Sequence, residues 1–382
     1  MRLVFGAGMP HNDSCRTHIS SGSSDSQHDR VRGQTQEEKN SMTSSHDQPF
    51  GWALIGCGSV GRSHSRWAVG TPDIDVHAFC DINEEAASSY YEQFEGRYYT
   101  TDADRIFADD SIEIVTIATT HGTHAELALA AFEAGKHVYL EKPMAMTSAD
   151  CMRIYHAMQA AGKKLMINFS IRFSGASRAI KSRLQPAKVS HAQVMLGRED
   201  LTRWQWLPGI GGGPLFDVGV HLADLLCWMH DSPPVEISAT GGQVTHPGQL
   251  ASPEIIDTVA ANIRFANGSV ATYLMSDAGF SEKLTKWFST FNDGQQSAVL
   301  DEHFSRATIT TPDPVSGELS TESYSPPFID RMPLLVEAIR NDTNPYVPAY
   351  PGILATLVLE NIIEAVHSGQ PQKVELPPEL NA

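Results

Sequence analysis

The sequence lacks the features of a membrane or exported protein. No apolar run approaches the ~18–20 residues that a membrane-spanning helix needs. The N-terminus lacks the apolar core of a signal peptide. Arg30 and Arg32 are not adjacent, and no apolar stretch follows them, which argues against twin-arginine export. These absences predict a protein without membrane contact, and we expect it in the cytoplasm.

Basic charge is also scarce. The chain has 28 Lys and Arg residues against 45 Asp and Glu residues, which gives a formal net charge of −17. A nucleic-acid binder needs a basic face, so this balance argues against nucleic acid as a partner. The length of 382 residues and the 41% hydrophobic content are enough for two domains with their own cores.

The cysteines form no recognisable framework. The chain has five cysteines, an odd number, and no Cys-x-x-Cys pair. They are Cys15, Cys57, Cys80, Cys151 and Cys227. This pattern predicts reduced thiols that pack in the interior, as in a reducing compartment.

Apolar periodicity is missing from residues 1–48, which are rich in Ser, His, Asp, Gln and Arg. Such a segment cannot bury enough surface to offset its ordering entropy, so we expect a disordered tail. The first sustained apolar run begins at Trp52, and Met42 is a second candidate for the true first residue.

From Trp52 onward, short apolar runs alternate with helical patterns. Strands are expected at 52–55, 76–80, 114–118, 137–140 and 165–169, with helices between them. This alternation predicts an α/β fold with a parallel sheet, and we assign residues 49–172 to a Rossmann dinucleotide-binding domain.

The pattern changes after residue 173. Longer strands are expected at 189–196, 235–244, 257–265 and 269–275, and Asn267-Gly268 is typical of a hairpin turn. We therefore expect residues 173–382 to form a C-terminal α/β domain with an open, mostly antiparallel sheet, for substrate binding and oligomerisation.

Gly56-x-Gly58-x-x-Gly61 follows the first strand and precedes a helix. Gly56 would make the tight turn, Gly58 would let the backbone approach a pyrophosphate, and Gly61 would let the helix pack on the strand. Ser59 and Val60 complete the predicted phosphate site, because the helix N-terminus supplies free N–H groups there.

Asp81 ends the second strand, twenty residues beyond Gly61. A carboxylate at that place accepts hydrogen bonds from the adenosine ribose and repels a 2′-phosphate, which favours NAD over NADP. An alternative role is the N-cap of the next helix, and both roles can coexist. Arg62 and Arg66 lie nearby and could soften the cofactor preference.

Two further motifs carry candidate chemistry. Lys142 follows Glu141 at the end of a predicted strand, where ligands bind in parallel sheets. A lysine there can stabilise negative charge that develops on a substrate oxygen. Asp217 and His221 are spaced i, i+4, so they share one face of a predicted helix, as a histidine base and a supporting carboxylate would. A surface pair is the alternative for such a spacing. We expect the base to titrate in the neutral to mildly alkaline range.

Together these motifs resemble the glucose–fructose oxidoreductase / inositol dehydrogenase (Gfo/Idh/MocA) family over residues 50–370. The resemblance rests on the glycine turn, on the segment 134–143 that ends in Glu141-Lys142-Pro143, and on Gly212-Gly213-x-x-x-Asp217-x-Gly219-x-His221. It implies that Lys142, Asp217 and His221 are the catalytic positions. It also implies a C-terminal sheet that forms the substrate floor and a homo-oligomer interface.

The resemblance extends to further candidate site residues. Family members often have Thr-Pro after the fourth strand, whereas this chain has Thr119-Thr120-His121. Thr119, His124 and Glu141 are expected to contribute to the cofactor site, and Arg172 and Trp204 to bind substrate. Core packing or an interface is an equal alternative for the tryptophan. Two histidines, His121 and His124, lack further ligands nearby, so no metal is expected.

We therefore expect an NAD-dependent oxidoreductase acting on a secondary alcohol of a sugar, polyol or inositol, in which the cofactor carries the hydride. One alternative is NAD-assisted glycoside cleavage, with transient oxidation followed by elimination. A second is a non-enzymatic sugar or dinucleotide sensor, and a third is reduction of a biliverdin-type or dihydrodiol substrate.

Overall fold

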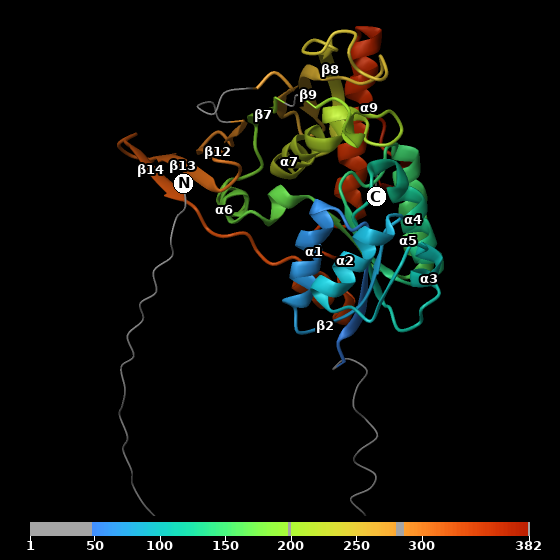
Figure 1. Cartoon of the computed structure of the whole chain (residues 1–382). Helices are drawn as coiled ribbons and strands as arrows, with labels where there is room; N and C mark the ends of the chain where they lie inside the picture. The colour runs from blue at the N-terminus through green and yellow to red at the C-terminus, as the bar shows by residue number, and fades with distance from the viewer. Residues whose placement is uncertain (1–47, 198–199, 280–285, 381–382) are drawn as a thin grey trace, which may run out of the picture. The chain divides into compact units, whose positions relative to one another are not determined.

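A computed structural model describes residues 48–197, 200–279 and 286–380 (Figure 1). The disordered tail expected at residues 1–48 lies outside this range except for its last residue, and so do Met42 and Cys15. From residue 48 onward the chain is one compact unit, so the domain boundary expected at residue 172 stays a prediction.

The first sheet has six strands, all paired in parallel, in the order β3-β2-β1-β4-β5-β6. This is the strand order of a Rossmann fold and confirms the predicted N-terminal architecture. Its strands are β1 (Phe50–Ile55), β2 (Ile74–Cys80), β3 (Tyr98–Thr100), β4 (Ile114–Ile117), β5 (His137–Glu141) and β6 (Leu165–Asn168).

Five helices connect these strands. They are α1 (Ser59–Val69), α2 (Glu84–Phe94), α3 (Ala103–Phe107), α4 (His124–Glu133) and α5 (Ser148–Ala161). α1 packs against α2 and α4 packs against α5, and the two pairs lie apart in Figure 1. Every residue of β4 is buried, as expected for a strand covered on both faces.

The second sheet has nine strands in the order β14-β13-β12-β11-β7-β10-β9-β8-β15. Among the described strands of this sheet, only β7 and β10 pair in parallel, which confirms the predicted mostly antiparallel sheet. Its strands are β7 (Val189–Met195), β8 (Pro234–Gly242), β9 (Thr258–Phe265), β10 (Val270–Ser276), β11 (Trp287–Asn292), β12 (Ser297–Asp301), β13 (Arg306–Pro312), β14 (Leu319–Tyr324) and β15 (Gln372–Lys373).

The helices of this half are α6 (Gly175–Arg183), α7 (Val220–His230), α8 (Met332–Arg340) and α9 (Ala349–Ser368). α7 packs against α9, and α9 packs along β8 and also reaches α5 and β6 of the first half. Along strand β9, buried residues alternate with exposed ones. The second sheet therefore has one covered face and one open face, as the period-two pattern requires.

One helix of the second half is long and mostly apolar, although Glu360 and Glu364 interrupt its apolar residues. α9, drawn in red in Figure 1, is 20 residues long and apolar enough to cross a membrane by length and composition. In this fold 67% of its most apolar 18-residue stretch is buried inside the protein. It is accordingly the central core helix of the second half, where it contacts α7 and β8.

Candidate active site

The glycine turn between β1 and α1 has the geometry of a dinucleotide site. Gly56 has a φ of +102°, and a Cβ there would lie 2.4 Å from the carbonyl oxygen of Ala118. A Cβ on Gly61 would lie 2.2 Å from the carbonyl oxygen of Gly56, so this glycine permits the close helix–strand approach. A Cβ on Gly58 would meet nothing within 4 Å, which leaves open space for a phosphate.

The first turn of α1 faces this open space. Ser59 and Val60 are both exposed there, and Gly58 precedes them as the N-cap without a side-chain bond. The first backbone N–H groups of α1 are thus available to an anion. This chain can hold the pyrophosphate of NAD at this place.

Asp81 lies beside the glycine turn. Its Oδ2 accepts a hydrogen bond of 2.7 Å from the backbone N–H of Cys57, and its Oδ1 accepts one of 2.9 Å from the N–H of Asn83. The N-cap of α2 is Asn83, which accepts bonds from Glu85 and Ala86, so the alternative role of Asp81 as the cap is wrong. The carboxylate is instead fixed at the end of β2, where a ribose would lie.

The described cysteines agree with the packing role. Cys57, Cys80, Cys151 and Cys227 are all free and buried. Burial raises the pKa of the Cys80 thiol to about 11, and the nearby Asp81 charge adds to this rise. Burial likewise raises the pKa of Cys151 to about 12. These thiols stay protonated and unreactive at neutral pH.

Lys142 and Asp217 come together across the two halves of the chain. The Lys142 Nζ donates to the Asp217 Oδ1 at 2.9 Å and to its backbone carbonyl oxygen at 2.5 Å. The side chains are 15% and 13% exposed, so the pair is mostly shielded from water. Lys142 follows β5, while Asp217 lies in a π-helical turn, Leu215–Gly219, just before α7. Such turns occur frequently at functional sites.

This ion pair revises the expected role of Asp217. The sequence spacing predicted that its carboxylate would support His221, whereas its ion pair here is with Lys142. The π-helical turn changes the angular offset that an ordinary helix would give residues i and i+4. Asp217 still acts on His221 through its charge, which favours the protonated ring.

His221 is buried at the start of α7, with its ring edge toward Phe169 and Trp287 at centroid distances of 6.2 Å. Its Nδ1 is buried without a hydrogen-bond partner among the described residues. Burial lowers the pKa of His221 to about 3, and the Lys142 charge adds to this shift. This lowered pKa differs from the neutral to mildly alkaline value expected from the sequence, which concerns the pH dependence of kcat/KM and stays a prediction. The ring is neutral at physiological pH and can accept a proton.

His121 is a site residue that sequence reasoning considered only as a metal ligand. It lies in a short 3₁₀ helix, His121–Thr123, directly after β4. Its Nδ1 lies 2.8 Å from the carbonyl oxygen of Gly211. Its ring is nearly perpendicular to that of Trp204, with the two ring centroids 4.8 Å apart. Burial lowers the pKa of His121 to about 3, with a further contribution from Lys142. Its place at the carboxyl end of a strand was the signal for a site role.

The expected cofactor residue His124 links the loop after β4, which contains Thr119, to the loop after β5, which contains Pro143. His124 is fully buried, and its Nδ1 lies 2.7 Å from the carbonyl oxygen of Pro143, next to Lys142. Its Nε2 lies 3.4 Å from the carbonyl oxygen of Thr119. Burial lowers the pKa of His124. Any effect of His124 on a cofactor would pass through these loops.

Arg172 is engaged within the protein. Its guanidinium makes three hydrogen bonds, of 2.7 to 3.0 Å, to the carboxylate of Asp224, which is 1% exposed. It also lies over the ring of Trp228. The structure thus joins Arg172 to a buried ion pair rather than to Lys142 and Asp217.

Among the described residues, no group of three or more His, Cys, Asp and Glu side chains could hold a metal ion. The charged side chains at the centre pair with one another instead.

Two family models match the chain in tandem. Residues 50–169 match the NAD-binding Rossmann fold of an oxidoreductase family, and residues 183–290 match the GFO/IDH/MocA C-terminal domain. This chain belongs to the Gfo/Idh/MocA oxidoreductase family. The resemblance inferred from the motifs is confirmed, and with it the enzyme class and the NAD-binding domain.

Similar curated proteins act on carbohydrates. The chain is 29% identical over 231 residues to a 1,5-anhydro-D-fructose reductase from Ensifer adhaerens, covering 58% of this chain and 68% of that protein. It is 28% identical to an inositol 2-dehydrogenase from Acidothermus cellulolyticus, covering 58% and 65%. A longer match, 25% identical over 342 residues, covers 85% of this chain and 96% of an inositol 2-dehydrogenase 2 from Saccharopolyspora erythraea.

Solved structures share the fold. An oxidoreductase domain protein from Kribbella flavida superimposes with a TM-score of 0.78 at 21% identity, covering 86% of this chain and all of that one. A levoglucosan dehydrogenase in complex with NADH and L-sorbose gives a TM-score of 0.77 at 21% identity, with the same coverage. At this identity the likeness shows the fold alone.

Proposed function

We propose that this protein is an NAD-dependent dehydrogenase that moves a hydride between nicotinamide and a secondary alcohol or ketone of a sugar, polyol or inositol. The observation that carries the proposal is the Lys142–Asp217 pair at the carboxyl end of β5, beside a neutral His221. Relatives named for anhydrofructose, inositol and levoglucosan support the substrate class.

In the oxidation direction, the Lys142 Nζ donates a hydrogen bond to the substrate hydroxyl oxygen and stabilises negative charge that develops on it. The neutral ring of His221 takes the hydroxyl proton. Since its Nδ1 is enclosed, Nε2 is the nitrogen that receives this proton. NAD, held at the glycine turn and Asp81, would supply the acceptor for the hydride of the carbinol carbon. Asp217 holds the ammonium group of Lys142 in place through two bonds.

Trp204 is the candidate for substrate contact outside the reacting centre. Its ring is half-buried beside His121, in the short 3₁₀ helix Trp204–Trp206. An aromatic face at that place would stack on the C–H bonds of a sugar ring. Arg172 is left out of this proposed site because Asp224 already holds its guanidinium.

NAD is the proposed physiological cofactor, with NADP used less efficiently. Asp81 is anchored at the end of β2 by two backbone N–H groups, so its charge faces the place of the ribose. A 2′-phosphate there would meet this negative charge.

We further propose a cytoplasmic homo-oligomer that binds neither nucleic acid nor membrane. The open face of the second sheet exposes Val189, Val270 and Thr272, a mixture of apolar and polar side chains suited to a second copy. The buried, free cysteines fit a reducing compartment. Light scattering of the purified protein tests the oligomer, since a monomer at all concentrations would contradict it.

The function is tested with a panel of sugars, polyols and inositols in the presence of NAD. The absorbance of NADH is followed, and the products are identified by mass spectrometry. We expect one molecule of NADH to form for each molecule of oxidised product. Release of free sugar without net NADH would favour NAD-assisted glycoside cleavage. NAD binding without turnover of any compound would favour a sensor.

A further inference from the structure

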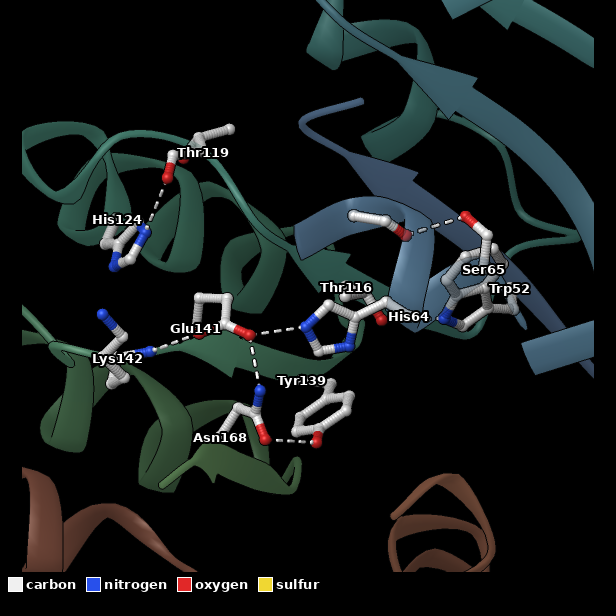
Figure 2. A network of polar contacts seen from close by, with 11 residues as sticks. Trp52, His64, Ser65, Thr116, Thr119, His124, Tyr139, Glu141, Lys142 and Asn168 are labelled. Carbon is white, nitrogen blue, oxygen red and sulfur yellow. Dashed lines mark hydrogen bonds and ion pairs between the residues drawn. The ribbon is translucent and has the colours of Figure 1, made fainter. Parts of the chain in front are cut away.

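A buried polar network lies beside Lys142 and centres on its neighbour Glu141 (Figure 2). Its centre is the carboxylate of Glu141, which is 6% exposed. The Glu141 Oε1 lies 2.7 Å from the Nε2 of His64 and 2.5 Å from the Nδ2 of Asn168. The hydroxyl of Tyr139 completes the network by donating to the Asn168 Oδ1 at 3.0 Å.

The network joins three elements of the first sheet. His64 comes from α1, Glu141 ends β5, and Asn168 ends β6. His64 is fully buried, and its ring is held edge-on between Trp67 and Tyr139 at centroid distances of 5.0 and 4.9 Å. The imidazole is therefore fixed in position before it meets the carboxylate.

The Glu141 carboxylate stays charged in this interior. Burial alone would raise its pKa, but the hydrogen bond and charge of His64, with the charge of Lys142, outweigh burial and lower the pKa to about 2. An ionised carboxylate accepts hydrogen bonds only, so His64 Nε2 and Asn168 Nδ2 are the donors. A buried charge that loses one of its donors becomes costly, so the three side chains form one unit.

Glu141 and Lys142 are neighbours that point in different directions. The Glu141 carboxylate is bonded to α1, whereas the Lys142 ammonium group is bonded to Asp217 of the other half of the chain. The backbone N–H of Lys142 donates to the Glu141 Oε2 at 3.2 Å. The carboxylate that His64 holds therefore holds the main chain of Lys142 in turn.

The same helix serves the cofactor. α1 begins at Ser59, directly after the glycine turn, and His64 lies within its first two turns. A shift of α1 on binding the pyrophosphate would therefore move His64, and through Glu141 it would move the backbone that carries Lys142.

We propose that His64 is a positioning residue: acting through Glu141, it ties the cofactor-binding helix α1 to the main chain of Lys142 and sets the place of the ammonium group. This role rests on the proposed dehydrogenase function, in which Lys142 contacts the reacting oxygen. It adds a residue that touches neither substrate nor nicotinamide.

The test compares His64→Ala with His64→Gln. The alanine variant removes the donor to Glu141, whereas the amide N–H of glutamine can replace it. Because a displacement of ~1 Å can cost about 100-fold in rate, His64→Ala should lower kcat by roughly 10- to 100-fold. The Kd for NADH should change less than about threefold, because α1 still presents its N-terminal N–H groups. His64→Gln should recover most of the kcat.

A matched control separates positioning from loss of stability. Thr116→Val removes the acceptor for the indole N–H of Trp52, a buried bond of 2.8 Å in the same sheet that does not involve Glu141 (Figure 2). It should lower Tm as His64→Ala does but leave kcat near that of the wild type. An equal loss of kcat in the control, or no recovery in His64→Gln, would overturn the proposal. If His64→Ala does not fold, Glu141→Gln replaces it, with the same kcat loss expected.

A second readout does not depend on turnover. The rate of Lys142 acetylation by a trace of acetic anhydride, measured by mass spectrometry, reports how firmly Asp217 holds the ammonium group. This rate should rise several-fold in His64→Ala and stay unchanged in Thr116→Val. If the wild type turns over no carbohydrate but this contrast is seen, the proposed function fails and the positioning role stands. An unchanged rate in His64→Ala overturns the positioning role itself.

Discussion

Replacing Lys142 with methionine removes the charge at the centre of the site but keeps the stem of the side chain. Lys142 donates two hydrogen bonds to Asp217, and the two side chains are 15% and 13% exposed. The loss of one donor to a developing oxyanion typically costs about 10²–10³-fold in kcat. We therefore expect Lys142→Met to lower kcat by roughly that factor.

The same substitution changes stability and proton affinity. Asp217 loses the two hydrogen bonds from Lys142 in a mostly buried place, which should cost about 1–3 kcal/mol of unfolding free energy. Burial and the Lys142 charge together lower the pKa of His221 to about 3. Without Lys142, burial remains, but the pKa of His221 should rise. Since the base must be neutral, kcat/KM should then fall at a higher pH on the acid side than it does in the wild type.

The assay combines steady-state kinetics over a range of pH, NADH binding by fluorescence and thermal unfolding. Arg153→Met is the control, because Arg153 is 51% exposed and pairs with Glu126 and Asp150 at the surface, where ion pairs contribute little. The control should behave like the wild type in all three measurements. A Lys142→Met variant with kcat within about tenfold of the wild type would refute the assigned role.

Two further predictions concern cofactor choice and acid stability. Asp81→Ala should narrow the preference for NAD over NADP in kcat/KM, because the charge that meets a 2′-phosphate is removed; a wild type that clearly prefers NADP would contradict this. Burial, with the charges of Lys163 and Lys164, lowers the pKa of His137 to about 4. A lowered histidine pKa means that the unfolded chain binds the proton first, so stability is kept above about pH 6.5 and is lost as pH falls towards 4. His137→Gln should reduce this loss by on the order of 1–3 kcal/mol in urea unfolding between about pH 7 and pH 4; an identical loss in both proteins would contradict the assignment.

The parts of the fold that local patterns determine were predictable from the sequence. The glycine turn, Asp81 and Lys142 each lie at the end of an apolar run, and strand ends meet at one edge of a parallel sheet. β3 and α3, with three and five residues, were missed because they are too short to show a period.

The pairing within the site was less predictable. Lys142 and Asp217 are 75 residues apart, and His64 and Glu141 are 77 apart, so only the folded chain shows which partner each charge has. Arg172 illustrates the same limit, because its partner Asp224 gave no local signal. The π-helical turn at Leu215–Gly219 also changed a geometry that the i, i+4 spacing had implied.

Lys142 and His221 are proposed to serve hydride transfer between NAD and a carbohydrate carbinol. Reduced cofactor that carries deuterium at nicotinamide C4, offered with a panel of keto-sugars and inosose-type ketones, makes this transfer visible. We expect the wild type to place one deuterium on the carbinol carbon of the product, as measured by mass spectrometry. Lys142→Met and His221→Ala should still bind NADH, but the rate of deuterium transfer should fall by about 10²-fold or more in each variant. Deuterium transfer at wild-type rates in both variants, or none in the wild type despite bound cofactor, would contradict the account.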